Sequence, residues 1–346
     1  MAVEETYQMM KAKLGHIVPD VELRIKAELV DQINDLKKAR NAIILGHNYM
    51  EPALYHTIPD FAGDSLALSR MAAKTDKDII VFCGVKFMAE TAKILNPGKT
   101  VLIPAKNAGC SLAASITAED VRELKRRFPG VPVISYVNTY ADVKAESDIC
   151  CTSGNAVAVV ESFGTDTVIF LPDEYLAGNV AKETGKHIIF PSLKGSSDPD
   201  LNSALDYQMI GWRGRCEVHE KFTVQDIQNI RKQFPQVVIL AHPECSPEVV
   251  DASDMSGSTS EMVKYVENTK APQYLLLTEC SMGDNIAAAN PEKDMLRLCS
   301  VRCPYMNMIT LEDTLKSLQR TQYVIEVPEE IRLRAAKAVE RMIAIG

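Results

Sequence analysis

Short apolar runs alternate along the chain with longer stretches in which apolar residues recur every three or four positions, a pattern that predicts strands alternating with helices. Three of the apolar runs, NAIILGHNY, VPVISYVNTY and QVVILAHPE, predict strands that lead to His47, Asn138 and His242. Each is followed by a turn rich in hydroxyl side chains and then by a stretch with helical periodicity. Because this order of elements occurs three times, the sequence predicts three related units.

A further strand and helix follow in each unit. The strands are predicted at DIIVFCG, TVIFLPD and QYLLLTE, and the helices at ETAKIL, LAGNVAKETG and DNIAAANP. The first two units then end on a final strand, KTVLIP and KHIIFP, whereas we predict none in the third. Strands that alternate with helices are typical of parallel sheets, so the fold class is α/β.

The units also divide the chain. We predict an N-terminal helical arm over 1–40, α/β repeats over 41–130, 131–235 and 236–315, and a C-terminal helical segment over 316–346. The segment from Pro191 to Arg215 is rich in Gly, Ser, Asp and Asn, which predicts an extended surface loop before Cys216. PEEIRLRAAKAVERMIAIG predicts an amphipathic C-terminal helix with two glutamates in its first turn.

Composition narrows the class of partner. With 46% hydrophobic and 24% charged residues, the chain is typical of a globular protein. Its 38 basic and 46 acidic residues give a net charge of -8, which offers no basic footprint for nucleic acid or an anionic membrane. The partner is therefore expected to be a small molecule. The first residues carry no apolar signal region and no long apolar run follows, so we expect a cytoplasmic protein.

Nine cysteines without a signal peptide indicate metal binding, catalysis or packing rather than a disulfide framework. One thiol follows each unit: Cys110 after the first, Cys216 after the second, and Cys299 with Cys303 after the third. Three thiolates from separate loops suit either a three-cysteine zinc site or a 4Fe-4S cluster in which one iron has no protein ligand. The residues alone do not choose between Cys299 and Cys303.

Polar side chains follow the first strand of each unit, where open α/β sheets place their ligands. They are His47, Tyr49, Tyr136, Asn138, His242 and Glu244. Imidazole, phenol and carboxylate groups together can bind a dicarboxylate and move protons. The turns add Ser65, Ser153, Ser258 and Thr259, which predict helix N-caps whose N–H groups can bind an anion. No Walker A or GxGxxG motif follows the strands, so a nucleotide is not expected.

Ten motifs in this order, GHNY, GDS, GVKFMAETAKIL, CSL, YVNT, CTSGNA, GRCEVHE, HPEC, GSTSEM and CPYM, resemble the quinolinate synthase family. The resemblance implies three similar Rossmann-like, parallel-sheet α/β domains around a pseudo-threefold axis. It also implies one 4Fe-4S cluster per chain with three cysteine ligands, which by motif are Cys110, Cys216 and Cys303. The resemblance thus selects Cys303 over Cys299.

The implied reaction is a transferase step of NAD biosynthesis. It condenses iminoaspartate with dihydroxyacetone phosphate to give quinolinate, phosphate and two waters, and the open iron polarises a departing hydroxyl group. The implied substrate-binding residues are His47, Ser65, Tyr136, Asn138, Ser153, His242, Glu244, Ser258 and Thr259. Tyr49, Glu244 and Tyr136 are the implied catalytic residues. A transient contact with L-aspartate oxidase, the source of iminoaspartate, is a further expectation.

Two departures and three alternatives accompany the resemblance. Tyr140 stands where the family often has a small residue, and CSVRC lacks the CxxCxxC of some relatives, so no redox switch based on that triplet is expected. The alternatives are an aconitase-like iron-sulfur hydro-lyase, a non-catalytic iron-sulfur sensor and a three-cysteine zinc hydrolase. A sensor would not need His47, Tyr49 and Glu244 beside its metal, and metal analysis separates the zinc enzyme.

Overall fold

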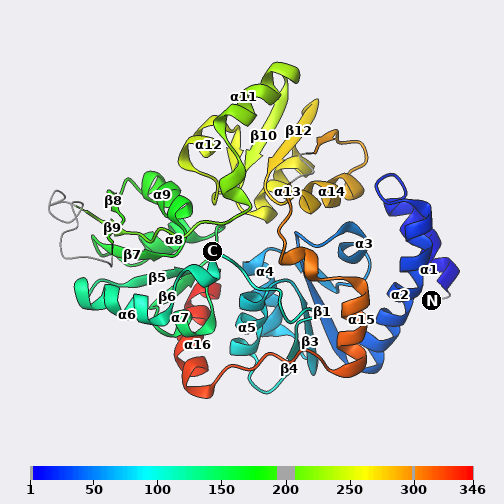
Figure 1. Cartoon of the computed structure of the whole chain (residues 1–346), viewed down its shortest axis with the longest axis horizontal. Helices are drawn as coiled ribbons and strands as arrows, with labels where there is room; N and C mark the ends of the chain where they lie inside the picture. Colours follow the sequence, from blue (N-terminus) through cyan, green and yellow to red (C-terminus); the bar gives the residue numbers. More distant parts are fainter. Residues whose placement is uncertain (1–2, 193–206, 298–300, 346) are drawn as a thin grey trace.

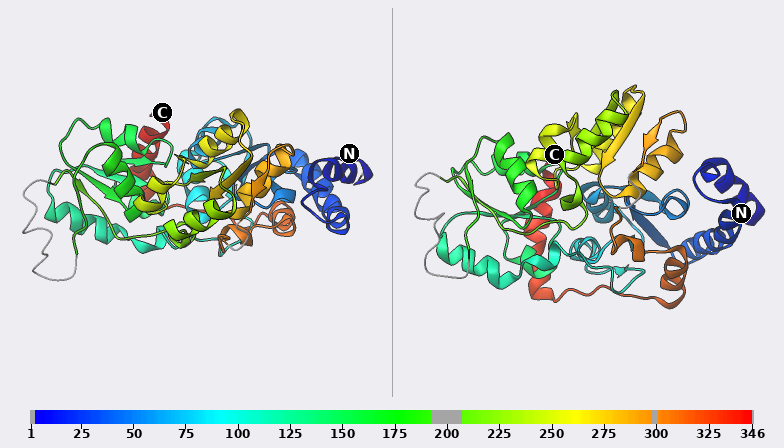
Figure 2. Two further views of the ribbon diagram at one scale, coloured as in Figure 1. Left: turned by 90° about the horizontal axis from the view of Figure 1, so that it is seen from above. Right: turned by 45° about the horizontal axis from the view of Figure 1, so that its top comes forward.

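The computed structural model of the chain describes residues 3–192, 207–297 and 301–345. These residues form three separate sheets, each made of parallel strands and flanked by helices, and the sheets surround a common centre (Figure 1). Seen from above in Figure 2, the N-terminal helices lie at one end of the molecule and the second sheet at the other. The predicted fold class, three similar parallel-sheet α/β domains, is confirmed.

The first and third sheets have the same strand order. In the first, β1 (Ala42–His47), β2 (Phe61–Gly63), β3 (Ile79–Cys83) and β4 (Thr100–Leu102) are arranged β2-β1-β3-β4. In the third, β10 (Val237–Ala241), β11 (Met255–Ser256), β12 (Gln273–Leu277) and β13 (Met295–Leu296) are arranged β11-β10-β12-β13. Strand β13 corrects our prediction that the third unit lacks a final strand. With two residues, it is too short to show a periodicity.

The second sheet contains one more strand. It consists of β5 (Val133–Tyr136), β6 (Ile149–Cys151), β7 (Val168–Leu171), β8 (Ile188–Ile189) and β9 (Met209–Ile210), in the order β6-β5-β7-β9-β8. Strand β9 pairs with β7, the place that β4 and β13 take in the other sheets, so the predicted strand KHIIFP is an additional edge strand. Strand β9 also corrects our prediction that the whole segment from Pro191 to Arg215 is a loop, because Met209 and Ile210 form a strand within it. Residues 193–206 of that loop lie outside the described residues.

An aspartate holds the first strand of each sheet in the same way. The backbone N–H groups of Ile44, Val133 and Ile239 donate to the carboxylates of Asp60, Asp148 and Asp254, each at a distance of 2.8 Å. Each aspartate N–H in turn donates to the carbonyl of the same strand residue. The three repeats therefore share local contacts as well as strand order.

Helices fill the connections between strands. They are α3 (Pro52–Tyr55), α4 (Ser65–Lys74) and α5 (Lys86–Leu95) in the first repeat, α7 (Ala141–Ala145), α8 (Ala156–Glu161) and α9 (Glu174–Glu183) in the second, and α12 (Pro247–Ala252), α13 (Thr259–Asn268) and α14 (Cys280–Ala289) in the third. The N-terminal arm is a pair of helices, α1 (Val3–Leu14) and α2 (Asp20–Ala39). Within the described part of the chain, no helix is long and apolar enough to cross a membrane.

Three further helices pass from one repeat to the next. Helix α6 (Ala118–Arg127) packs on the second sheet, α11 (Val224–Gln233) on the third, and α15 (Leu311–Arg320) returns to α2 and β3 of the first. The C-terminal helix α16 (Glu329–Ala344), predicted from its amphipathic pattern, packs on α7 and β6. The chain thus closes a ring of repeats, while the predicted boundaries at 40, 130, 235 and 315 stay predictions.

Candidate active site

The carboxyl ends of the first strands of all three sheets meet around one central cavity with ≈ 630 Å³ of empty space, part of it open to solvent. Every repeat contributes to its lining. The predicted site residues that line it are His47, Tyr49, Ser65, Cys110, Tyr136, Asn138, Ser153, Cys216, His242, Glu244 and Thr259. The structure therefore brings most of the predicted residues together, while their individual roles stay predictions.

Two predicted residues lie beside the cavity rather than in its lining. The Ser258 hydroxyl accepts a hydrogen bond from the Glu261 N–H and caps α13. Cys303 packs between two hydrophobic clusters, and its loop reaches the cavity through Met306. Cys299 lies outside the described residues.

The two strand-end histidines are held in the same way. The Nδ1 atoms of His47 and His242 accept from the backbone N–H two residues later, on Tyr49 at 3.2 Å and on Glu244 at 3.3 Å. Burial lowers the pKa of His47 to about 4, and burial with the neighbouring His219 lowers that of His242 to about 3. Both imidazoles are thus neutral at pH 7 and carry their proton on Nε2.

Glu244 is a buried carboxylate with three partners. One oxygen accepts from the Tyr136 hydroxyl at 2.5 Å and from the Asn138 amide at 3.2 Å, and the other lies 2.8 Å from Nδ1 of His219. Burial opposes ionisation, but the His219 imidazole, His242 and the Tyr136 hydroxyl together hold the pKa of Glu244 below its usual value. Oδ1 of Asn138 is buried without a partner, so it can accept a hydrogen bond from a ligand.

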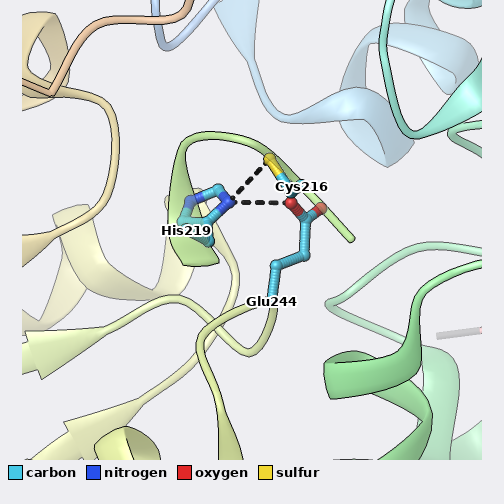
Figure 3. Close-up of side chains that lie close together, drawn as sticks. All are labelled: Cys216, His219 and Glu244. Atoms are coloured by element: carbon cyan, nitrogen blue, oxygen red, sulfur yellow. Dashed lines mark hydrogen bonds and ion pairs between the residues drawn. The ribbon is translucent and has the colours of Figure 1, made fainter. Parts of the chain in front are cut away.

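His219 was not predicted as a site residue. Its Nδ1 lies 2.8 Å from Glu244 and 3.2 Å from Sγ of Cys216, as Figure 3 shows, and its Nε2 lies 2.9 Å from the Thr278 hydroxyl. That hydroxyl is 2.5 Å from the Tyr49 hydroxyl. A continuous chain of hydrogen bonds therefore joins Tyr49 to Glu244. The signal in the sequence was the histidine of GRCEVHE, three residues after Cys216.

The three cysteine loops share one conformation. Each Sγ accepts hydrogen bonds from the backbone N–H groups two and three residues later. The second of these residues begins a 3₁₀ helix: η1 (Ala113–Ser115), η2 (His219–Lys221) or η3 (Met306–Met308). A threonine seven residues after the cysteine (Thr117, Thr223 or Thr310) then caps α6, α11 or α15. Burial raises the pKa of each thiol, and the two amide donors per sulfur offset part of that rise.

This conformation has a sequence signature that our prediction did not use. The pattern is a cysteine, a threonine seven residues later and an aspartate three residues after that, and it occurs at Cys110, Cys216 and Cys303. The residue seven positions after Cys299 is Met306. The pattern therefore groups Cys303, rather than Cys299, with Cys110 and Cys216 without reference to any family.

The thiols fit a metal group larger than one ion. Burial raises the pKa of Cys110 to about 12 and that of Cys303 to about 11, and repulsion from Cys303 adds to the shift of Cys110. Among the described residues, only Cys216, His219 and Glu244 have ligand atoms close enough to share a single ion, all within 4.8 Å. Three thiolates spaced more widely, each held by amide donors, suit a cluster whose positive irons offset their charge.

Comparison with known proteins gives one consistent result. The family model described as quinolinate synthetase A protein matches residues 31–344. The chain is 52% identical over 333 residues to quinolinate synthase 2 of Mesorhizobium japonicum, covering 96% of both proteins. It is 50% identical to the quinolinate synthase of Agrobacterium fabrum and 48% identical to that of Xylella fastidiosa, covering 96% of this chain and 90% and 92% of theirs.

Proposed function

Because the chain belongs to the quinolinate synthetase A family, we propose that its central cavity condenses iminoaspartate with dihydroxyacetone phosphate to quinolinate, releasing phosphate and two waters. In this proposal the enzyme is a transferase. The observation that carries it is the cavity itself, where neutral imidazoles, hydroxyl turns and a buried carboxylate from three repeats surround a space beside the thiols. A non-catalytic sensor would need none of these groups.

The cofactor belongs to the same proposal. Cys110, Cys216 and Cys303 would hold one 4Fe-4S cluster, since their loops present the sulfurs in one conformation with paired amide donors. When bound, such a cluster supplies an iron without a protein ligand, a Lewis acid that can polarise a hydroxyl group. The side chains of the cavity bind the substrates and move protons.

Anion binding falls to the turns and the histidines. Ser65 and Thr259 are the first residues of α4 and α13 rather than the N-caps that we predicted, since Asp64 and Ser258 cap these helices. Their hydroxyls and the free N–H groups of those helix ends can bind carboxylate or phosphate oxygens. The Nε2 protons of His47 and His242 add neutral donors. Two small anions can thus be held without a buried positive charge. Asn138, with its unpartnered Oδ1, can accept from an amine or hydroxyl.

Proton transfer falls to the chain of hydrogen bonds around Glu244. Its carboxylate can accept a proton from the substrate while Tyr136 and Asn138 hold it in place. On the other side, the Tyr49 hydroxyl reaches Glu244 through Thr278 and His219. Burial raises the pKa of Tyr49 and Tyr136 well above the usual value, so both phenols stay protonated and act as donors.

The direct test is the reaction under anaerobic conditions. Protein with its cluster assembled, supplied with dihydroxyacetone phosphate and freshly generated iminoaspartate, should form quinolinate and release one phosphate per quinolinate, without ATP or a nicotinamide. Iron and sulfide counts with an absorption spectrum identify the cluster in the same sample. Protein that holds a cluster, forms no quinolinate and instead dehydrates a simple hydroxy acid would be a hydro-lyase. The transient contact with L-aspartate oxidase stays a prediction.

A further inference from the structure

The three hydroxyl turns at the cavity are not closed in the same way. In the first, Oδ1 of Asp64 accepts from the Ala67 N–H at 2.9 Å. In the third, the Ser258 hydroxyl accepts from the Glu261 N–H at 3.4 Å, and the Glu261 carboxylate accepts from the Ser258 N–H at 2.7 Å. Each of these turns is therefore fixed by the helix that it precedes, through a side-chain cap.

The second turn has no such cap, because no side chain caps α8. Instead, Oδ1 of the buried Asn155 accepts from the N–H and the hydroxyl of Thr152, at 2.7 and 3.2 Å. Its Nδ2 donates to the carbonyls of Met342 and Ile345, at 3.2 and 2.9 Å. The amide orientation is fixed, because only nitrogen can donate to those carbonyls. The second turn is thus tied to the C-terminal end of α16.

The first repeat also binds the C-terminal segment, residues Ile343–Ile345, through Arg70. Nε of Arg70 donates to the carbonyl of Ile343 at 3.1 Å, and its Nη2 donates to that of Ile345 at 3.2 Å. Arg70 lies in α4, whose first residue, Ser65, lines the cavity. Figure 1 places the C-terminus at the centre of the molecule, near α4 and α8.

We infer that residues Ile343–Ile345 position the substrate-binding turn of the second repeat. They hold Thr152 and Ser153 through Asn155 and tie that turn to α4 through Arg70. Thr152 and Ser153 line the cavity, whereas Asn155, Arg70 and the segment do not, so the last three are positioning residues. Docking of the C-terminus then sets substrate affinity, an inference that rests on the proposed function for the identity of the ligand.

Kinetics of three single variants test the role in binding. Arg70→Ala removes two hydrogen bonds to the segment. Asn155→Asp keeps the oxygen that accepts from Thr152 but places a carboxylate against the carbonyls of Met342 and Ile345. Both Arg70→Ala and Asn155→Asp should therefore release the segment. We expect KM for iminoaspartate to rise roughly 2- to 12-fold, the range of one net hydrogen bond, with kcat changed less than about twofold. Arg341→Ala is the control, since Arg341 joins α16 to the Asp148 carbonyl and does not touch the turn.

A double variant separates a shared route from general loosening. Because Arg70 and Asn155 act through one segment, combining the two substitutions should raise KM no further than the stronger single substitution does. The inference would be overturned if the KM increases of Arg70→Ala and Asn155→Asp multiplied in the double variant, or if Arg341→Ala raised KM equally. An unchanged KM in both Arg70→Ala and Asn155→Asp would also overturn it.

Amide hydrogen exchange gives a readout that needs no activity. The Thr152 N–H should exchange faster in Arg70→Ala and in a chain that ends at Ala344. The Ala67 and Glu261 N–H groups, which close the other two turns, should exchange as in the unchanged protein. Unchanged exchange at Thr152 would overturn the inference even if quinolinate forms. If no quinolinate forms, the proposed function fails, while the exchange data still decide whether the segment holds the turn.

Discussion

The two sides of the cavity differ in how far the three repeats remain alike. On the thiol side, all three loops place a sulfur over two amide donors, continue into a 3₁₀ helix and end at a threonine cap. On the strand-end side, the positions that correspond by the shared aspartate contacts hold His47, Tyr136 and His242 at one place and three different residues, Tyr49, Asn138 and Glu244, at the other. The repeats have kept one half of the site and diversified the other.

The difference follows from what each side must do. The proposed cluster would take one cysteine at each of three irons, so three equivalent ligand loops suit it. A condensation of two unlike molecules needs a base, acids and anion sites at different places, so equivalent side chains would not serve. Asn138 illustrates the divergence: it corresponds to Tyr49 and Glu244, but its amide donates to the Glu244 carboxylate at 3.2 Å and its Oδ1 has no partner.

The largest expected effect tests the equivalence of the thiols. Cys110→Ala, Cys216→Ala and Cys303→Ala should each abolish the cluster, because each removes one of three ligands. The measurement is the iron and sulfide content with the visible absorption spectrum after anaerobic reconstitution.

Cys299→Ala is the matched control and should keep the cluster. Loss of the cluster in that variant with retention in Cys303→Ala would reverse the assignment and break the threefold comparison.

A smaller effect tests the divergent side. Glu244→Gln keeps the size of the side chain and removes the base, so kcat should fall by about 10² to 10⁴, as for other general acid-base groups. The cluster spectrum should not change. Glu248→Gln, an exposed glutamate four residues further on, should keep normal turnover. Normal turnover in Glu244→Gln would remove this carboxylate from the mechanism.

The smallest effect sharpens the threefold comparison. Thr117→Ala, Thr223→Ala and Thr310→Ala each remove a helix cap and should lower the free energy of unfolding by about 0.5–2 kcal/mol. Thr310 should lie at the lower end, since its cap lacks the reciprocal bond present at Thr117 and Thr223.

Thermal unfolding of the protein without metal gives the order of the three. If one threonine-to-alanine substitution lowered the free energy of unfolding several times more than the other two, the loop of that threonine would not be equivalent to the other loops.

The sequence predicted the parts of the fold that rest on continuous patterns. Strands such as β1 and β10 were predicted because their apolar runs are long, whereas strands of two residues, such as β9 and β13, are recognised only by their pairing with neighbouring strands. The strand-end residues were predicted because a strand end is visible in the sequence. Thr278 and His219 were not, since their place between Tyr49 and Glu244 depends on contacts between separate repeats.

The return of α15 to the first repeat has a consequence for folding. Thr314 of α15 lies against Cys83 of β3, their polar atoms 3.7 Å apart across 231 positions of sequence. Such distant pairings slow folding, because a long loop must close before the contact forms. During synthesis part of one apolar face of the first sheet, at β3, would therefore stay uncovered until residues 311–320 leave the ribosome. We expect the nascent chain to be most prone to aggregation, and most dependent on chaperones, in that interval.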